Sequence, residues 1–327
     1  MNNRNRSLPD RIIEPLALVV ITPLALSTIV YFGYVTAYSF GIFSEESFFG
    51  FFTDGIFRYR ALGTWLFSGF CDVFPELGLT VNWLRFFDDC SGMFDPVFYS
   101  KLFYFNSMVF VALSSVMYIF YRKRFQGIAL AGIMLFSQIL AALGMFVFVH
   151  YDLLTYMFLF LGGILVLRDG GWLRLLLLSI TLALATMTRE TSILIISLFV
   201  TAYRKDIFAL NRRRLVEFGI LSLVYLGTYF GLRLAMGGSG SSFLNHMILL
   251  RSLSTMSHLI IFLFSLSLIY LITRENRSDS LWFLFFALPY ILPVLYTGIQ
   301  MEMRLHIPIV FGLLMLYAES RRETSRV

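Results

Sequence analysis

Long apolar segments separated by short polar connections dominate this chain. A helix that crosses the hydrocarbon core of a bilayer needs about 20 mostly apolar residues. The hydrophobic pattern predicts ten such segments, at residues 14–38, 101–121, 127–149, 153–167, 172–188, 191–203, 215–235, 258–273, 281–299 and 305–318. We therefore expect an all-α polytopic membrane protein with about ten transmembrane helices, within a range of roughly 8–11.

Polar residues form two short tails and one long connection. Residues 1–13 form the first tail, of which the first ten residues are polar and basic. The apolar segment after them continues without a small-residue cleavage site, which favours a retained span over a removed signal peptide. Residues 319–327 form the second tail. The connection at 40–100 mixes acidic residues with Phe and Trp, which predicts amphipathic helices in the membrane interface. We expect residues 1–327 to form a single transmembrane domain.

Composition supports the membrane class. The chain is 58% hydrophobic and 14% charged, with a mean hydropathy of +0.77. Soluble domains carry roughly 45–50% apolar and about 25% charged residues. No polar stretch is long enough to bury a core of its own, so a separate soluble domain is not expected.

Basic residues are sorted between alternate connections. With a cytoplasmic N-terminus, 18 of the 26 Lys and Arg residues fall on the inner side, and the net charges are +9 inside and −3 outside. This is the positive-inside distribution. It predicts both termini in the cytoplasm, and it explains the net charge of +6 by the bilayer as partner, without nucleic acid. The short loops and the lack of sorting signals favour a multi-pass protein of the bacterial inner membrane.

Ionisable side chains recur at the outer connections. The stretch TRETS places Arg189 beside Glu190 between the fifth and sixth segments, where a polar hairpin tip is the simpler interpretation. Other outer connections also carry acids, bases or both, which favours one polar cavity at the outer membrane face. Its expected members are Asp54, Arg58, Arg60, His150, Asp152, Arg189, Glu190, Arg233, Glu302, Arg304 and His306.

These residue types suit chemistry on a lipid-linked phosphate. A carboxylate can act as a general base, and arginines bind phosphate through charge-assisted hydrogen bonds. We expect an acceptor hydroxyl to attack a group activated by a lipid phosphate, with the phosphate leaving toward the arginines. The chain has no P-loop, dinucleotide fingerprint, HExxH or GxSxG motif. No cofactor is expected, although His150 with Asp152, or His306 with Glu302, could bind a divalent metal.

The pattern resembles the GT-C superfamily of polytopic glycosyltransferases, which use sugars carried on polyprenyl phosphate. The resemblance lies in the cytoplasmic N-terminus, the acidic residue of TDGIFRYRAL in a long first outer loop, and the interfacial helices of that loop. TRETS and EMRLHIP also look like outer-turn segments of bacterial members. The resemblance implies Asp54 as the catalytic base. Glu190 is expected as a second catalytic carboxylate because of its place among the charged outer connections. The resemblance also implies that the donor phosphate is held by arginines among Arg58, Arg60, Arg189, Arg233 and Arg304.

The sequence departs from that family in three ways. The acidic pair is absent from TDG, the chain is short for the class, and we expect no outer C-terminal domain. The expected function is inverting transfer of a sugar from a polyprenyl-phosphate carrier to a hydroxyl of an envelope glycan, a lipid or a protein, as in polysaccharide biosynthesis.

Three alternatives to this function stay open. The first is a flippase or transporter of a lipid-linked saccharide, since Pro289 and Pro293 could break the ninth segment. The others are a polysaccharide polymerase and a scaffold in an envelope complex. Cys71 and Cys90 both lie in the outer loop, as a disulfide or as two free thiols.

Overall fold

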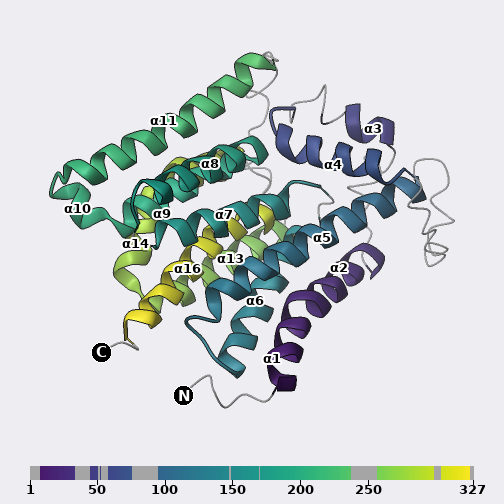
Figure 1. Ribbon diagram of the computed structural model, residues 1–327, viewed down its shortest axis with the longest axis horizontal. Coiled ribbons are helices and arrows are strands. Elements are labelled where there is room, and N and C mark those ends of the chain that lie inside the picture. Colours follow the sequence, from purple (N-terminus) through teal and green to yellow (C-terminus); the bar gives the residue numbers. More distant parts are fainter. Residues whose placement is uncertain are drawn as a thin grey trace.

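Helices make up the fold of this chain (Figure 1). The computed structural model describes residues 8–33, 45–50, 52, 58–75, 95–146, 149–168, 170–236, 256–297 and 303–324, and within these ranges there is no strand. The expected all-α class is confirmed. The elements are α1 (Leu8–Pro15), η2 (Leu16–Ile21), α2 (Thr22–Gly33), α3 (Glu45–Phe49), α4 (Ala61–Val73), α5 (Pro96–Tyr121), α6 (Ile128–Gly144), α7 (Asp152–Val166), α8 (Trp172–Thr188), η6 (Glu190–Ser192), α9 (Ile193–Ala202), α10 (Arg204–Phe208), α11 (Arg212–Ala235), α13 (Met256–Glu275), α14 (Arg277–Phe286), α15 (Leu288–Thr297), η7 (Met303–Leu305) and α16 (Ile307–Thr324).

Within the residues that the structure describes, three helical stretches are long and apolar enough to cross a membrane: Ile12–Phe32, Val97–Tyr121 and Arg212–Ala235. A fourth candidate is the pair α14 and α15, which is bent by 64°. Shorter apolar helical stretches of 10–17 residues are Ile128–Gly144, Asp152–Val166, Trp172–Thr188, Glu190–Ala202 and Leu263–Arg274. At 1.5 Å per residue, 17 residues extend about 25 Å, less than the roughly 30 Å of a bilayer core. The apolar helices are consistent with a membrane protein, while ten crossings remain a prediction.

Local sequence explains where the long helices begin. The Asp95 carboxylate accepts hydrogen bonds from the backbone N–H groups of Val97 and Phe98, and Pro96 occupies the first turn of α5. The Asn211 side chain accepts from the Arg213 N–H at the start of α11. Both helices therefore start at a capping residue that satisfies otherwise unpaired backbone donors.

Helix α7 lies at the centre of the bundle and packs against α5, α8, α9 and α16. Two adjacent glycines allow this close packing. A Cβ at Gly162 would lie 2.7 Å from Ile195 Cδ1 of α9, and one at Gly163 would lie 2.3 Å from Met315 Cε of α16. Small residues bring apolar helices together where no side chain separates them.

The connections between helices lie at two opposite ends of the bundle, and ion pairs join them to one another at each end. At one end Arg174 pairs with Glu217, Arg124 with Glu319 and Arg204 with Asp279. We call it the Glu217 end. The other end holds the connections before α7 and α16 and the connection between α8 and α9; we call it the Asp152 end. Helices α8 and α11 both begin at the Glu217 end and run toward the Asp152 end.

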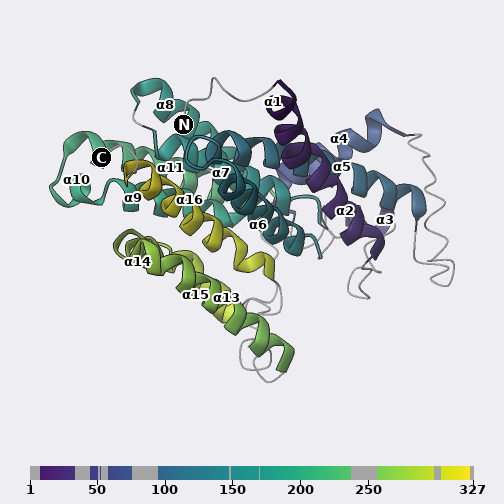
Figure 2. The ribbon, with the colours of Figure 1, turned by 90° about the horizontal axis from the view of Figure 1, so that it is seen from below.

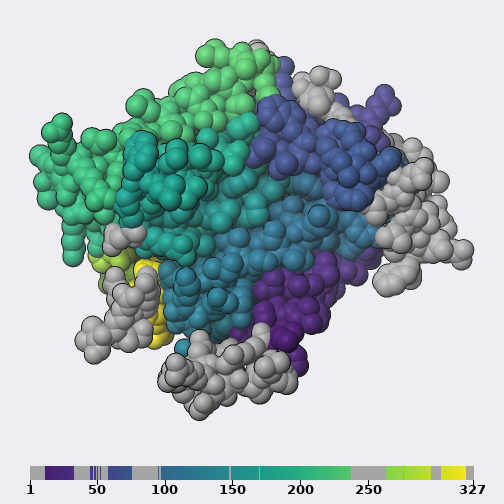
Figure 3. All heavy atoms as spheres, in the orientation of Figure 1, coloured from purple at the N-terminus to yellow at the C-terminus, as the bar shows by residue number. Residues whose placement is uncertain are grey.

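The C-terminal helices form a separate layer. Figure 2 shows α13, α14 and α15 together on one side of α16, and α14 packs against both α9 and α16. On the face drawn in Figure 3, α11 forms one edge of the molecule, with α8 beside it. Many side chains along α11 are exposed, including Leu223 and Leu234.

Within the connection expected at 40–100 the structure describes α3, α4 and the first turn of α5, which begins at Pro96 because Asp95 caps it. Helix α4 buries Gly63, Phe67 and Cys71 on one side and exposes Trp65 and Leu66 on the other. This one-sided burial seats α4 on the bundle; its position in a membrane interface remains a prediction. The Cys71 thiol is buried and free, and Cys90 lies outside the described residues.

Candidate functional site

An ion triad joins three connections at the Asp152 end. Arg189 Nη1 lies 2.6 Å from Asp152 Oδ1, and Arg304 Nη1 lies 3.3 Å from Asp152 Oδ2. All three side chains are less than a tenth exposed. Asp152 begins α7, Arg189 follows α8, and Arg304 lies in η7. Buried charges persist when they are paired, so this triad fixes the three connections relative to one another.

A second ion pair joins the turn before α4 to the same place. Arg60 Nη2 lies 3.0 Å from Glu190 Oε1, and Arg60 Nη1 donates to the Tyr151 hydroxyl. The Arg60 guanidinium also lies over the Tyr151 ring, 4.8 Å from its centroid. Because Tyr151 precedes Asp152 and Glu190 follows Arg189, the pair and the triad are parts of one network.

The Arg233 guanidinium contacts two tyrosine rings beside this network. Its guanidinium carbon lies 4.3 Å from the ring centroids of both Tyr59 and Tyr229, a geometry that supports cation–π attraction. Its Nε is buried without a hydrogen-bond partner. Among the residues that the structure describes, no carboxylate forms an ion pair with Arg233. The Arg60 guanidinium carbon lies 5.7 Å from the centroid of the same Tyr59 ring.

Only one of the two oxygens of the Glu190 carboxylate is hydrogen-bonded within the described chain. Arg60 binds Oε1, whereas Oε2 is buried and has no hydrogen-bond partner within the described chain. The side chain as a whole is 34% exposed. Tyr225 donates to the Glu190 backbone carbonyl over 3.4 Å, and its ring stacks on that of Tyr229. Glu190 Oε2 and the Arg233 guanidinium therefore lie in neighbouring parts of one site.

His150 is enclosed rather than exposed. Its Nε2 lies 3.1 Å from Thr64 Oγ1, and the rings of Phe48, Phe52 and Phe67 surround it. Burial, with a smaller effect of the Arg60 charge, lowers the pKa of His150 to about 3. The imidazole is thus neutral at pH 7, and it could contact a ligand only if these rings separated.

The remaining expected residues are placed as follows. Arg58 is half-buried and makes no ion pair with described residues. His306 is buried in the turn before α16. Asp54 and Glu302 lie outside the described residues. No group of three His, Cys, Asp or Glu side chains suited to a metal occurs in the described part of the chain, and Asp152 is engaged by two arginines.

The tyrosines of the site were not expected from the sequence. A signal for two of them was present, because Tyr225, Tyr229 and Arg233 are spaced four residues apart on α11 and so share one face of that helix. Tyr59 and Tyr151 stand beside Arg60 and Asp152 in the chain. Aromatic residues adjacent to charges at the ends of apolar segments were therefore the missed indication.

Comparison of the chain with protein-family models, curated proteins and solved structures gave no match.

Proposed function

We propose that this protein is a membrane glycosyltransferase that moves a sugar from a polyprenyl-phosphate carrier to a hydroxyl acceptor at the Asp152 end. The proposal rests on two groups in neighbouring parts of the site: Arg233, which makes no ion pair with a described carboxylate, and Glu190, whose Oε2 has no hydrogen-bond partner among the described residues. A phosphate would neutralise the first, and an acceptor hydroxyl would hydrogen-bond the second.

The roles follow from these contacts. The ion pair with Arg60 favours the ionised form of Glu190, which suits a base rather than an acid. The base removes the proton of the acceptor hydroxyl while the hydroxyl oxygen attacks the anomeric carbon. The bond between that carbon and the phosphate oxygen breaks, and the electron pair leaves with the phosphate, which Arg233 binds. Asp54 is the alternative base, on the resemblance to GT-C transferases.

Asp152, Arg189 and Arg304 have a different role in this proposal. Each carboxylate oxygen of Asp152 already accepts from an arginine inside the bundle. We assign them as positioning residues that hold Glu190 and its turn in place. Tyr59 and Tyr229 keep the Arg233 guanidinium oriented toward the donor phosphate.

A specific observation also favours a second candidate, a transporter of a lipid-linked saccharide. Helices α14 and α15 are bent by 64° at Ala287, and broken helices near the substrate are typical of transporters. The bent element reaches the site region, since the Tyr290 hydroxyl donates to the Leu305 backbone carbonyl over 2.8 Å. The two candidates differ in whether the bond between sugar and phosphate is broken.

The test measures release of free polyprenyl phosphate by purified protein from a panel of polyprenyl-phosphate sugars, with wild type beside Glu190→Gln, Asp54→Asn and Arg233→Gln. Loss of a general base lowers a rate by about 10²–10⁴-fold. We expect that loss for one carboxylate variant, and a raised KM for Arg233→Gln. Glu46→Gln, on the exposed side of α3, is the matched control and should keep full activity.

The same preparations are reconstituted in proteoliposomes to follow a labelled lipid-linked sugar across the bilayer. Release of polyprenyl phosphate without an acceptor product would indicate hydrolysis, and chain extension would indicate a polymerase. No release from any donor, with equal lipid movement in wild type and variants, would overturn the transferase and leave the transporter.

A further inference from the structure

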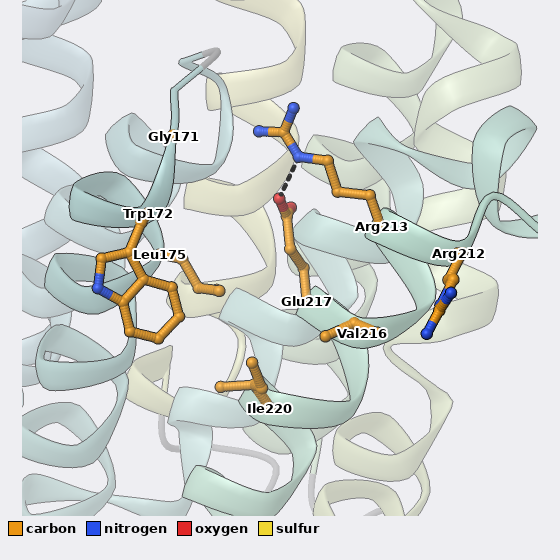
Figure 4. Close-up of a pocket in the computed structure, with 8 residues that line it drawn as sticks. All are labelled: Gly171, Trp172, Leu175, Arg212, Arg213, Val216, Glu217 and Ile220. Atoms are coloured by element: carbon orange, nitrogen blue, oxygen red, sulfur yellow. Dashed lines mark hydrogen bonds and ion pairs between the residues drawn. The ribbon is translucent and has the colours of Figure 1, made fainter.

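A pocket lies at the Glu217 end, between the first turns of α8 and α11 (Figure 4). Its volume is about 650 Å³. It is lined by Gly171, Trp172, Leu175, Arg212, Arg213, Val216, Glu217 and Ile220. Helix α8 has 17 residues and extends about 25 Å, so this pocket is far from the site at the other end of the same helices.

The charged wall of the pocket carries more positive than negative charge. The Glu217 carboxylate accepts from Arg174, Arg213 and Arg214 at 2.7, 3.1 and 2.8 Å. Arg213 remains 60% exposed at the side chain, although it also donates to the Gly170 carbonyl. Arg212 is exposed and makes no ion pair with the residues that the structure describes. This wall can therefore accept a further anion.

The apolar wall of the pocket is formed by Leu175 of α8 and by Val216 and Ile220 of α11, the helix that also carries Arg212 and Arg213. It continues along the outside of the bundle. Trp172 is 71% exposed at the mouth of the pocket. Exposed leucines follow along both helices, including Leu176 on α8 and Leu223 on α11. Tryptophan beside basic residues, above an apolar groove, is the arrangement expected at a membrane–water interface.

We propose that this pocket binds one anionic phospholipid. Its headgroup phosphate pairs with Arg212 and Arg213, and one acyl chain lies along Val216 and Ile220 in the groove between α8 and α11. Both helices begin at the pocket, so the positive ends of their dipoles add to the attraction for the phosphate. Basic pockets between membrane helices bind acidic lipid headgroups on the same physical grounds.

The occupant is a lipid rather than a soluble phosphate because the apolar wall opens onto the exposed faces of α8 and α11. A soluble anion would leave Leu175, Val216 and Ile220 in contact with water, whereas an acyl chain would cover them. The inference needs only a membrane environment and does not depend on the proposed transferase activity.

The test counts lipids retained by the purified full chain, by native mass spectrometry after extraction from nanodiscs of phosphatidylglycerol or of phosphatidylcholine. We expect wild type to keep one phosphatidylglycerol in preference to phosphatidylcholine, and Arg212→Gln/Arg213→Gln to lower that preference about tenfold. Arg122→Gln/Lys123→Gln removes the same charge from two exposed residues of another connection and should leave the preference unchanged.

A second variant separates the pocket from surface charge. Val216→Trp fills the apolar wall at a half-exposed position while both arginines stay in place, and it should also lower retention. Equal losses in the Arg212/Arg213 and Arg122/Lys123 variants would overturn the proposal, since they would show attraction by overall charge. Competition by free inorganic phosphate equal to that by lipid would overturn it in favour of a soluble anion.

Discussion

Arg189 and Glu190 are neighbours in the chain but not partners in the structure. The Arg189 backbone is extended, with φ −167° and ψ 146°, and consecutive side chains of an extended backbone point to opposite sides. Arg189 therefore reaches Asp152, whereas Glu190 reaches Arg60. The two charges of TRETS therefore do not pair with each other across the turn but bind partners on other connections.

At this residue scale the Asp152 triad provides a test of stability. Asp152→Asn removes the negative charge that compensates Arg189 and Arg304, and both would remain buried. Breaking a buried ion pair on one side costs about 3–5 kcal/mol. We expect a clearly lowered midpoint of thermal unfolding in detergent.

The matched control for this substitution is Asp279→Asn. Asp279 pairs with Arg204 at 2.6 Å but is 36% exposed, and such pairs contribute about 0–1 kcal/mol. If both variants unfolded at the same temperature, the triad would contribute no more than a surface pair.

At the scale of elements, the position of α4 depends on one glycine. A Cβ at Gly63 would lie 2.8 Å from Tyr151 Cβ and 3.1 Å from His150 Cδ2. Tyr151 Cβ is attached directly to the backbone and cannot turn away. The lack of a side chain at Gly63 is therefore what lets α4 approach the turn before α7 and bring Arg60 to Glu190.

We expect Gly63→Ala to destabilise the fold by about 1–3 kcal/mol through overpacking, and to lower any activity that depends on the Arg60–Glu190 pair. The matched control is Gly69→Ala on the same helix, where a Cβ meets nothing within 4 Å. That change should stabilise α4 by roughly 0.5–1 kcal/mol, because alanine favours helix more than glycine does. Thermal unfolding of both variants measures the difference, and a stabilising Gly63→Ala would contradict the close packing.

At the scale of the whole molecule, the connections lie at two ends of the bundle. The distribution of basic residues predicts that the Glu217 end is cytoplasmic. The test uses a chain with Cys71→Ser and Cys90→Ser and one new cysteine at a time. Arg58→Cys tests which side of the membrane the Asp152 end faces, and Lys123→Cys tests the Glu217 end. In right-side-out vesicles we expect an impermeant maleimide to label the first directly and the second only after permeabilisation. The reverse pattern would invert the orientation.

The sequence by itself determined the helical class, because long apolar runs favour helices locally. The exact starts were missed: α5 begins at Pro96 and α11 at Arg212, after the capping residues Asp95 and Asn211, whereas the apolar pattern predicted starts at 101 and 215. The sequence also indicated which connections carry charge. It also contains Gly63 and the four-residue spacing of Tyr225, Tyr229 and Arg233 on α11. Their roles became clear only from the residues that they contact in the structure.

Only the tertiary structure decided which charges pair, which polar atoms have no hydrogen-bond partner within the described chain, and where the pocket forms. Arg60 is separated from Glu190, and Asp152 from Arg304, by more than a hundred residues. Such contacts depend on how whole helices pack, and hydrophobic periodicity does not specify which partner a terminal charge will meet. The bend between α14 and α15 and the groove between α8 and α11 also arise from packing, because each is a relation between two helices rather than a property of either one.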